Sequence, residues 1–133
     1  MYTNGNRRLR ATALSFRAPL RGEPPLYAEF LGVELRNADL RYLTVDYVFW
    51  RFSNLSGANF SHSTIYNTDF MDTDLQGVNF EHASLLNVEF YHSDLSGADL
   101  SDLYSHTGVT WTNTICPDGT NSVDNGDTCW NNL

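Results

Sequence analysis

Large apolar residues recur at every fifth position of this chain from residue 30 to residue 100. A second and mostly small residue precedes each of them by two positions, and a polar residue usually lies between the two. The large positions are Phe30, Leu35, Leu40, Val45, Trp50, Leu55, Phe60, Ile65, Phe70, Leu75, Phe80, Leu85, Phe90, Leu95 and Leu100. A five-residue period fits neither an α-helix nor a β-strand. It is explained by a chain that turns a corner every five residues and points one large and one small side chain inward from each short side.

A second period of twenty residues overlies the first. Gly57, Gly77 and Gly97 occupy the same slot at this spacing, and His62 falls twenty residues before His82. The large residues divide at the same spacing into four columns, which begin at Leu35, Leu40, Val45 and Trp50. Four short sides therefore close one coil. The pattern predicts a coil of about four turns.

This repeat resembles that of the pentapeptide-repeat family, whose consensus is Ala-(Asp/Asn)-Leu-X-X. The matching triplets are Ala38-Asp39-Leu40, Ala58-Asn59-Phe60, Val78-Asn79-Phe80 and Ala98-Asp99-Leu100. The resemblance covers residues 28–100. It implies an all-β fold, a right-handed quadrilateral β-helix with the large and small side chains stacked inside and with coils stacked at about the strand spacing of 4.8 Å.

The period fails after Leu100, at Ser105 and Thr110, and Ile115 is expected to return to the Leu95 column. Two cysteines then flank a loop rich in Gly, Asn and Asp, which suits a hairpin closed by a Cys116–Cys129 disulfide. A bridge of this loop length contributes about 3 kcal/mol. Similar tails end some pentapeptide-repeat proteins. A disulfide indicates an oxidising compartment, either outside the cytoplasm or in an organelle lumen; the alternative is two free thiols in the cytosol.

The segment before the repeat has a different composition. Residues 1–22 contain five arginines and no acid, and Pro19, Pro24 and Pro25 mark a linker. The composition is that of an organelle transit peptide, but we favour an arm that folds over the first coil. The chain thus divides into an N-terminal arm (1–27), the β-helix (28–115) and a C-terminal capping hairpin (116–133).

Charge is distributed unevenly along the chain. Residues 1–51 hold all eight arginines and carry a net charge of +3, whereas residues 52–133 carry −11. An acidic body repels phosphates, so we expect no direct binding of nucleic acid, and the acids also favour solubility. The sequence has no apolar run of the roughly 18 residues that a transmembrane helix needs, so we expect no membrane insertion.

Acids precede several of the large apolar residues, and two explanations apply to them. They are Asp69, Asp74, Glu89, Asp94 and Asp99. Resemblance to the DNA-mimic subgroup of the family implies binding to DNA gyrase, a type II topoisomerase, and protection of it from quinolones. The explanation that we favour is that Asp and Asn in this slot bond to backbone groups at the corners.

Candidate metal ligands and catalytic residues give weak signals. Two imidazoles and a carboxylate are offered by His62, His82 and Glu81. A row of solvent-exposed side chains stacked one coil apart is the better explanation. The cap acids and amides offer oxygen ligands for calcium, but their spacing is not that of an EF-hand loop and turns explain them better; they are Asp118, Asn121, Asp124 and Asp127. We therefore expect no metal, no cofactor and no catalysis.

The first full coil departs most from the repeat. Phe49 occupies a slot that elsewhere prefers Asp or Asn, and Tyr47 and Phe52 are expected to point outward beside Arg51. Either residues 1–27 cover these aromatics, or they form a site for a partner. We expect a non-catalytic interaction or structural module, such as an accessory subunit that docks on a larger assembly through its first coil and arm. The DNA mimic is the alternative; the sequence leaves the partner and the oligomeric state open.

Overall fold

The computed structural model describes residues 28–130. The predicted arm and the last three residues of the predicted cap lie outside the described residues. The described elements are β1 (Ala28–Leu31), β2 (Thr44–Asp46), β3 (Val48–Arg51), β4 (Thr64–Met71), β5 (Ser84–Tyr91), β6 (Ser105–Thr107), β7 (Thr110–Thr112) and the 3₁₀ helix η1 (Ser122–Asn125).

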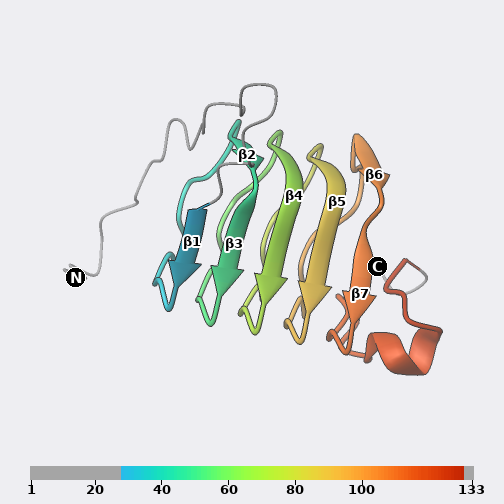
Figure 1. Ribbon diagram of the computed structural model, residues 1–133. Coiled ribbons are helices and arrows are strands. Elements are labelled where there is room, and N and C mark those ends of the chain that lie inside the picture. Colours follow the sequence, from blue (N-terminus) through green and yellow to red (C-terminus); the bar gives the residue numbers. More distant parts are fainter. Residues whose placement is uncertain (1–27, 131–133) are drawn as a thin grey trace, which may run out of the picture.

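The strands lie side by side in one parallel sheet of seven strands (Figure 1). The order is β1-β3-β4-β5-β6, and β2 and β7 pair with β4 and β5. Partner residues differ by twenty positions, as in Trp50 opposite Phe70 and Phe70 opposite Phe90. Each turn of the chain therefore lies directly on the previous one. This confirms the predicted all-β solenoid of about four turns.

Corners recur every five residues, as the sequence predicts. The residues in the corner slot have positive φ, including the bulky Tyr42, Phe52 and His62 at 50–61°. Non-glycine residues seldom adopt this region, so the surrounding structure has to hold them there. Hydrogen bonds between coils do so: Phe52 N–H donates to the Met71 carbonyl and His62 N–H to the Glu81 carbonyl, both at 3.0 Å. Four corners in each twenty-residue turn give the coil four sides.

Large apolar side chains fill the interior in the predicted columns. The column that begins at Phe30 is an aromatic stack, and its successive ring centroids (Phe30, Trp50, Phe70, Phe90 and Trp111) lie 4.6, 6.4, 5.3 and 4.7 Å apart. Trp50, Phe70 and Phe90 are fully buried. Each such side chain contributes on the order of 1.5–3 kcal/mol on burial, and ring pairs add to this.

The small inner slot has a role that the sequence pattern did not indicate. In the small slot two positions before Leu55, Leu75, Leu95 and Cys116, a Ser or Thr hydroxyl donates a hydrogen bond to the backbone carbonyl of an aromatic residue in the previous coil. The bonds are Ser53 to Phe30 (3.2 Å), Thr73 to Trp50 (3.0 Å), Ser93 to Phe70 (2.6 Å) and Thr114 to Phe90 (2.8 Å). These buried hydroxyls therefore tie successive coils together.

The predicted position of Ile115 is wrong. Up to Asp99 the partners differ by twenty residues, but from Ser105 onward they differ by 21. One extra residue is accommodated between Leu100 and Ser105, where Tyr104 is 85% exposed. Ile115 consequently pairs with Asp94, and the buried Cys116 takes the place beneath Leu95.

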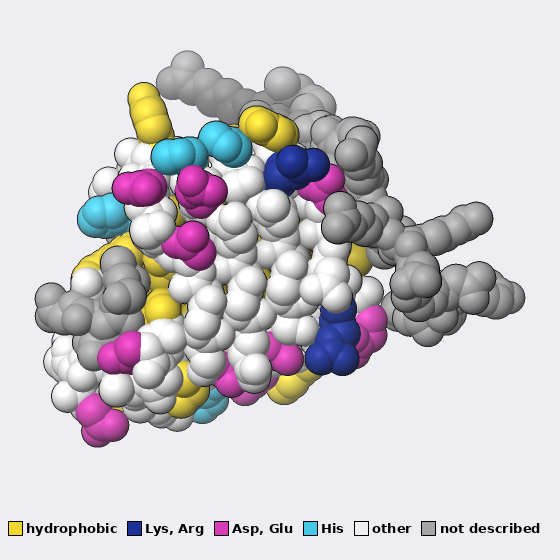
Figure 2. Space-filling view, turned by 180° about the vertical axis from the view of Figure 1, so that it is seen from behind, with side chains coloured by type: hydrophobic (Ala, Val, Ile, Leu, Met, Phe, Trp, Pro, Cys, Tyr) yellow, Lys and Arg dark blue, Asp and Glu magenta, His cyan; other side chains and the backbone are white. Residues whose placement is uncertain are grey.

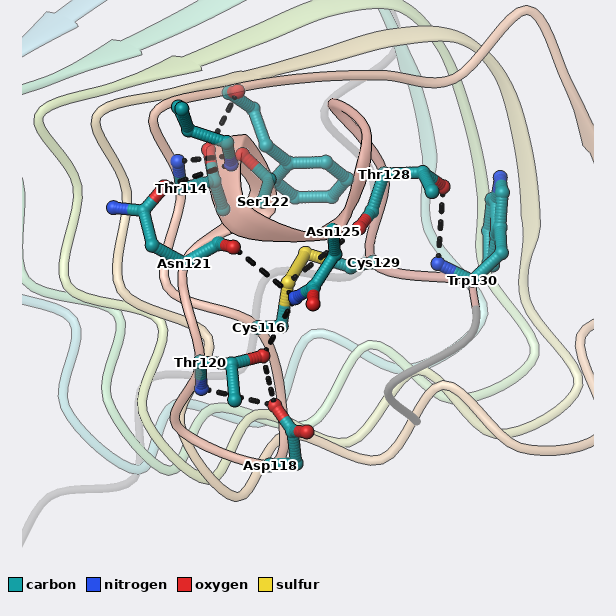
Figure 3. Close-up of a disulfide and its surroundings, with 12 residues drawn as sticks. Thr114, Cys116, Asp118, Thr120, Asn121, Ser122, Asn125, Thr128, Cys129 and Trp130 are labelled. Carbon is teal, nitrogen blue, oxygen red and sulfur yellow. Dashed lines mark hydrogen bonds between the residues drawn. A yellow bond between two sulfur atoms is a disulfide. The ribbon is translucent and has the colours of Figure 1, made fainter.

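The C-terminal cap closes the rod as predicted, through a disulfide between Cys116 and Cys129 (Figure 3). Both cysteines are fully buried. The Trp130 ring lies 4.5 Å from the His106 ring and 5.1 Å from the Trp111 ring, so it packs over the end of the interior. Asn121 begins η1 by accepting the Val123 N–H.

We predict that the cap depends on its disulfide. The bridge closes a loop with a sequence separation of 13, so replacing both cysteines (C116A/C129A) should lower the free energy of unfolding by about 3 kcal/mol. Urea unfolding followed by tryptophan fluorescence measures this change. A loss below about 0.5 kcal/mol would show that packing of Trp130 alone holds the cap.

We also predict that the inner hydroxyls stabilise the stack. Ser93→Ala removes a buried donor and should cost about 1–2 kcal/mol. Ser101→Ala removes an exposed hydroxyl that bonds to Asp99 and serves as the control, with a loss below about 0.5 kcal/mol. Equal losses in the two variants would contradict a special role for the inner slot.

Candidate functional site

Each coil has two consecutive strand sides followed by two sides that end in turns, and the two kinds use their acids differently. On the sides that end in turns, the carboxylates of Asp74, Asp94 and Asp99 each accept the N–H of the residue two positions later, at 2.9–3.1 Å. This confirms the backbone role that we favoured for these three acids.

The reverse side of the molecule shows mostly uncharged surface in its middle, with acids toward its edges (Figure 2).

Asp69 and Glu89 lie on a strand side and show no such bond. They face each other across β4 and β5, and the same row begins with Glu29 on β1 and Phe49 on β3. A second row beside it runs through Leu31, Arg51, Met71 and Tyr91. We call these two outward rows together the strand face.

The first-coil residues singled out from the sequence lie within and beside this face. Phe52 is exposed, whereas Tyr47, Phe49 and Arg51 are half-buried. An Arg51 guanidinium nitrogen lies 3.4 Å from a Glu29 carboxylate oxygen, and the guanidinium carbon lies 5.7 Å from the centre of the Phe49 ring. Arg51 thus contacts two neighbours on this face, and its Nε is buried with no hydrogen-bond partner among the described residues.

Exposed large apolar side chains concentrate at the two ends of the described rod. Leu31, Tyr42 and Phe52 are 65%, 69% and 62% exposed and belong to the first coil. Tyr104 and Val123 are exposed at the other end, and none lies between residues 53 and 103. Sequence reasoning missed Leu31 and Tyr42, because they occupy outward slots in which the repeat accepts any residue.

Asp69 has an unfavourable electrostatic environment. Burial raises the pKa of its carboxyl, Glu89 raises it further, and Asp72 also raises it, while Arg51 opposes the shift. One carboxylate oxygen, Oδ1, is buried and has no hydrogen-bond partner in the part of the chain that the structure describes. The ionised carboxylate is therefore poorly compensated within the fold.

Histidines stack along one corner, as the sequence predicts. The His62 ring lies 5.1 Å from both the Tyr42 and the His82 rings, and His82 Nε2 lies 3.6 Å from a Glu81 oxygen. Over residues 28–130, no group of three or more His, Cys, Asp or Glu side chains is placed to hold a metal ion.

The candidate calcium ligands in the cap do not converge. An Asp118 oxygen accepts the N–H and the hydroxyl of Thr120, and the Asn121 oxygen accepts the Val123 N–H (Figure 3). Asp124 and Asp127 are exposed. Asp118 and Asn121 thus have the turn-forming role that we favoured.

A shallow, open depression lies beside the strand face and is lined by Asp72, Thr73, Asp74, Gln76, His92 and Asp94. Among the helices of residues 28–130, none has the length and apolar character needed to cross a membrane.

Known structures with the same architecture include HetL from the cyanobacterium Nostoc sp., a pentapeptide-repeat protein involved in regulation of heterocyst differentiation. HetL is 24% identical, with a TM-score of 0.65; the match covers 70% of this chain and 42% of HetL. This chain therefore spans about two fifths of the length of HetL.

Two further structural matches have low TM-scores. Rfr23 from the cyanobacterium Cyanothece is 16% identical, with a TM-score of 0.35, over 62% of this chain and 80% of Rfr23. The plasmid-mediated fluoroquinolone resistance protein QnrB1 is 22% identical, with a TM-score of 0.33, over 66% of this chain and 42% of QnrB1.

Sequence comparison agrees with the stacked architecture. A search of the curated proteins finds no match. The sequence profile of the family Pentapeptide repeats matches residues 34–72 and 67–102, in eight copies. The matched residues make up more than half of the chain and coincide with the stacked coils, and on this basis the chain belongs to the pentapeptide-repeat family.

Proposed function

We propose that this protein is a non-catalytic interaction module that docks on a protein partner through its first coil. The docking surface is the first-coil patch, defined as Leu31, Tyr47, Phe49, Arg51 and Phe52. One observation carries the proposal: at the N-terminal end of the described rod, exposed large apolar side chains lie in the first coil, and the coils between residues 53 and 103 have none.

The patch has the composition of a protein interface. Aromatic residues and arginine are the side chains that most often dominate binding energy. Arg51 is already held against Glu29 and Phe49, so little side-chain entropy is lost when a partner covers it. Exposed Leu31 and Phe52 supply apolar area next to it.

The filled interior supports a role without catalysis. Trp50, Phe70 and Phe90 fill the interior, and the depression beside the strand face is open and shallow. Catalytic sites usually require a concave pocket in which several polar groups converge and from which water is excluded.

The DNA-mimic alternative receives less support. Three of the five acids that suggested it hold backbone N–H groups at turns, which accounts for their presence without a partner. Binding to DNA gyrase stays a prediction of that alternative. Inhibition of gyrase supercoiling at micromolar protein would support it, and no effect at that concentration would exclude it.

We further propose that the protein works in an oxidising compartment. Support comes from the buried disulfide between Cys116 and Cys129, since such bridges persist where the thiol pool is oxidising. Thiol titration of protein taken from its native source, denatured without reductant, should find no free thiol. Two free thiols would contradict this proposal.

We predict that the partner is lost when the first-coil patch loses its exposed apolar side chains. Leu31→Ser with Phe52→Ser should reduce partner capture from the native source at least about tenfold, because two apolar contacts are removed. Both side chains are exposed, so thermal unfolding should change little. Quantitative mass spectrometry of pull-downs measures the captured protein.

The matched control removes the same kind of surface at the other end of the rod. Tyr104→Ser with Val123→Ser should leave capture of that partner unchanged. Loss of the partner with the control variant, or its retention by both variants, would contradict docking through the first coil.

A further inference from the structure

Two carboxylates on the strand face are not used by the fold. Asp69 and Glu89 are opposite partners on β4 and β5, where neighbouring strands lie about 4.8 Å apart. Like charges in directly opposite positions destabilise a sheet. Unlike Asp74, Asp94 and Asp99, this pair accepts no backbone N–H in the described part of the chain. Packing and turn formation therefore do not explain the pair.

An apolar row lies directly beside this pair. Met71 and Tyr91 occupy the neighbouring outward row of the same strands, and both are half-buried. The face thus presents two carboxylates alongside a thioether and a phenol ring. It continues without a break from the first-coil patch, since Phe49 pairs with Asp69 and Arg51 with Met71.

Among the Lys and Arg side chains of the described residues, only Arg51 lies on this part of the face, and the His92 imidazole lies beside it, 3.7 Å from an Asp72 oxygen. No Lys or Arg follows Arg51 in the sequence, and Arg51 is engaged by Glu29. Arg51 lowers the pKa of the Asp69 carboxyl, but burial and Glu89 outweigh it. A second cation placed over Asp69 and Glu89 would relieve the repulsion between them.

We propose that Asp69, Glu89, Met71 and Tyr91 receive an arginine-bearing segment of the protein partner. The inference rests on the proposed function, because the same partner would cover the adjacent first-coil patch. A guanidinium group bridges the two carboxylates through its planar fork of N–H donors. Its methylene stem packs on Met71 and beside the Tyr91 ring, which is itself stacked on the His92 ring with centroids 4.1 Å apart.

Arginine fits this face better than the other ligands with the same charge. A metal ion needs converging donors, and residues 28–130 contain no such group of three or more. A lysine ammonium is a compact point charge that meets one carboxylate well but does not match a pair in two adjacent strands. The apolar row also favours a ligand that combines a charge with a hydrocarbon stem.

The electrostatic repulsion between Asp69 and Glu89 can be tested without a ligand. The folded-state pKa of Asp69 is raised, so its ionised form destabilises the fold and its protonated form does not. Asp69→Asn should therefore raise Tm at pH 7, and this gain should disappear as the pH falls below the ordinary pKa of an aspartate. A lower Tm at pH 7 would show that the carboxylate is satisfied within the chain and would overturn the proposal.

Binding is tested with the full chain and a defined probe. The probe is an octapeptide of alternating arginine and leucine, and its affinity is measured by fluorescence anisotropy. Asp69→Asn with Glu89→Gln should weaken binding at least about tenfold. Asp102→Asn with Asp124→Asn removes the same charge from two exposed acids elsewhere and should weaken it less than about twofold.

The comparison separates the outcomes. Equal weakening by the two variants would show attraction to net charge alone and would overturn the proposal, as would equal binding of an alternating lysine–leucine octapeptide. The L31S/F52S variant should still bind the arginine probe while losing the native partner. If the arginine site fails and the native partner still depends on Leu31 and Phe52, the proposed function stands and only this inference falls.

Discussion

Backbone hydrogen bonds between successive coils hold residues over their partners twenty positions earlier, or 21 positions earlier from Ser105 onward, and every other feature depends on this stacking. Identical slots therefore stack into columns. Inside the rod, the columns become an aromatic stack and a series of hydroxyl-to-carbonyl bonds that join one coil to the next. Outside the rod, the same register places like residues together even where they repel. The same stacking that fills the core with matching side chains lowers the stability of the fold where a surface column repeats a like charge.

The two kinds of side resolve this cost differently. On the turn sides, acids such as Asp94 bind the backbone N–H two residues later, and the charge stabilises a corner. The strand sides have their N–H groups engaged by neighbouring strands, so Asp69 and Glu89 have no such use. A carboxylate whose pKa is raised by burial and by a neighbouring acid weakens the fold. Its position next to the exposed aromatics of the first coil suggests that a partner, rather than the fold, accounts for it.

Most of the architecture was predictable, because a strict five-residue period leaves one way to place large side chains inward. The columns and the outward Phe52 followed from it, and the disulfide followed from two cysteines that flank a turn-rich loop. The position of Ile115 did not, because a single extra residue near Tyr104 shifts the register without breaking the chain. Trp111 and Cys116, each one place past a core slot, carried the signal for that shift. The difference between Asp69 and Asp74 was out of reach, because the slot is the same and only the backbone hydrogen-bonding partners differ.

We propose that a protein partner covers the first coil and the strand face that continues from it. Hydroxyl-radical footprinting of the full chain, alone and with its captured partner, tests this most directly, because Phe, Met and Tyr side chains all react. The account predicts protection of Phe52, Met71 and Tyr91 by the partner and an unchanged reaction at Tyr104. Protection confined to Tyr104 and the cap, with Phe52 and Met71 unchanged, would contradict it.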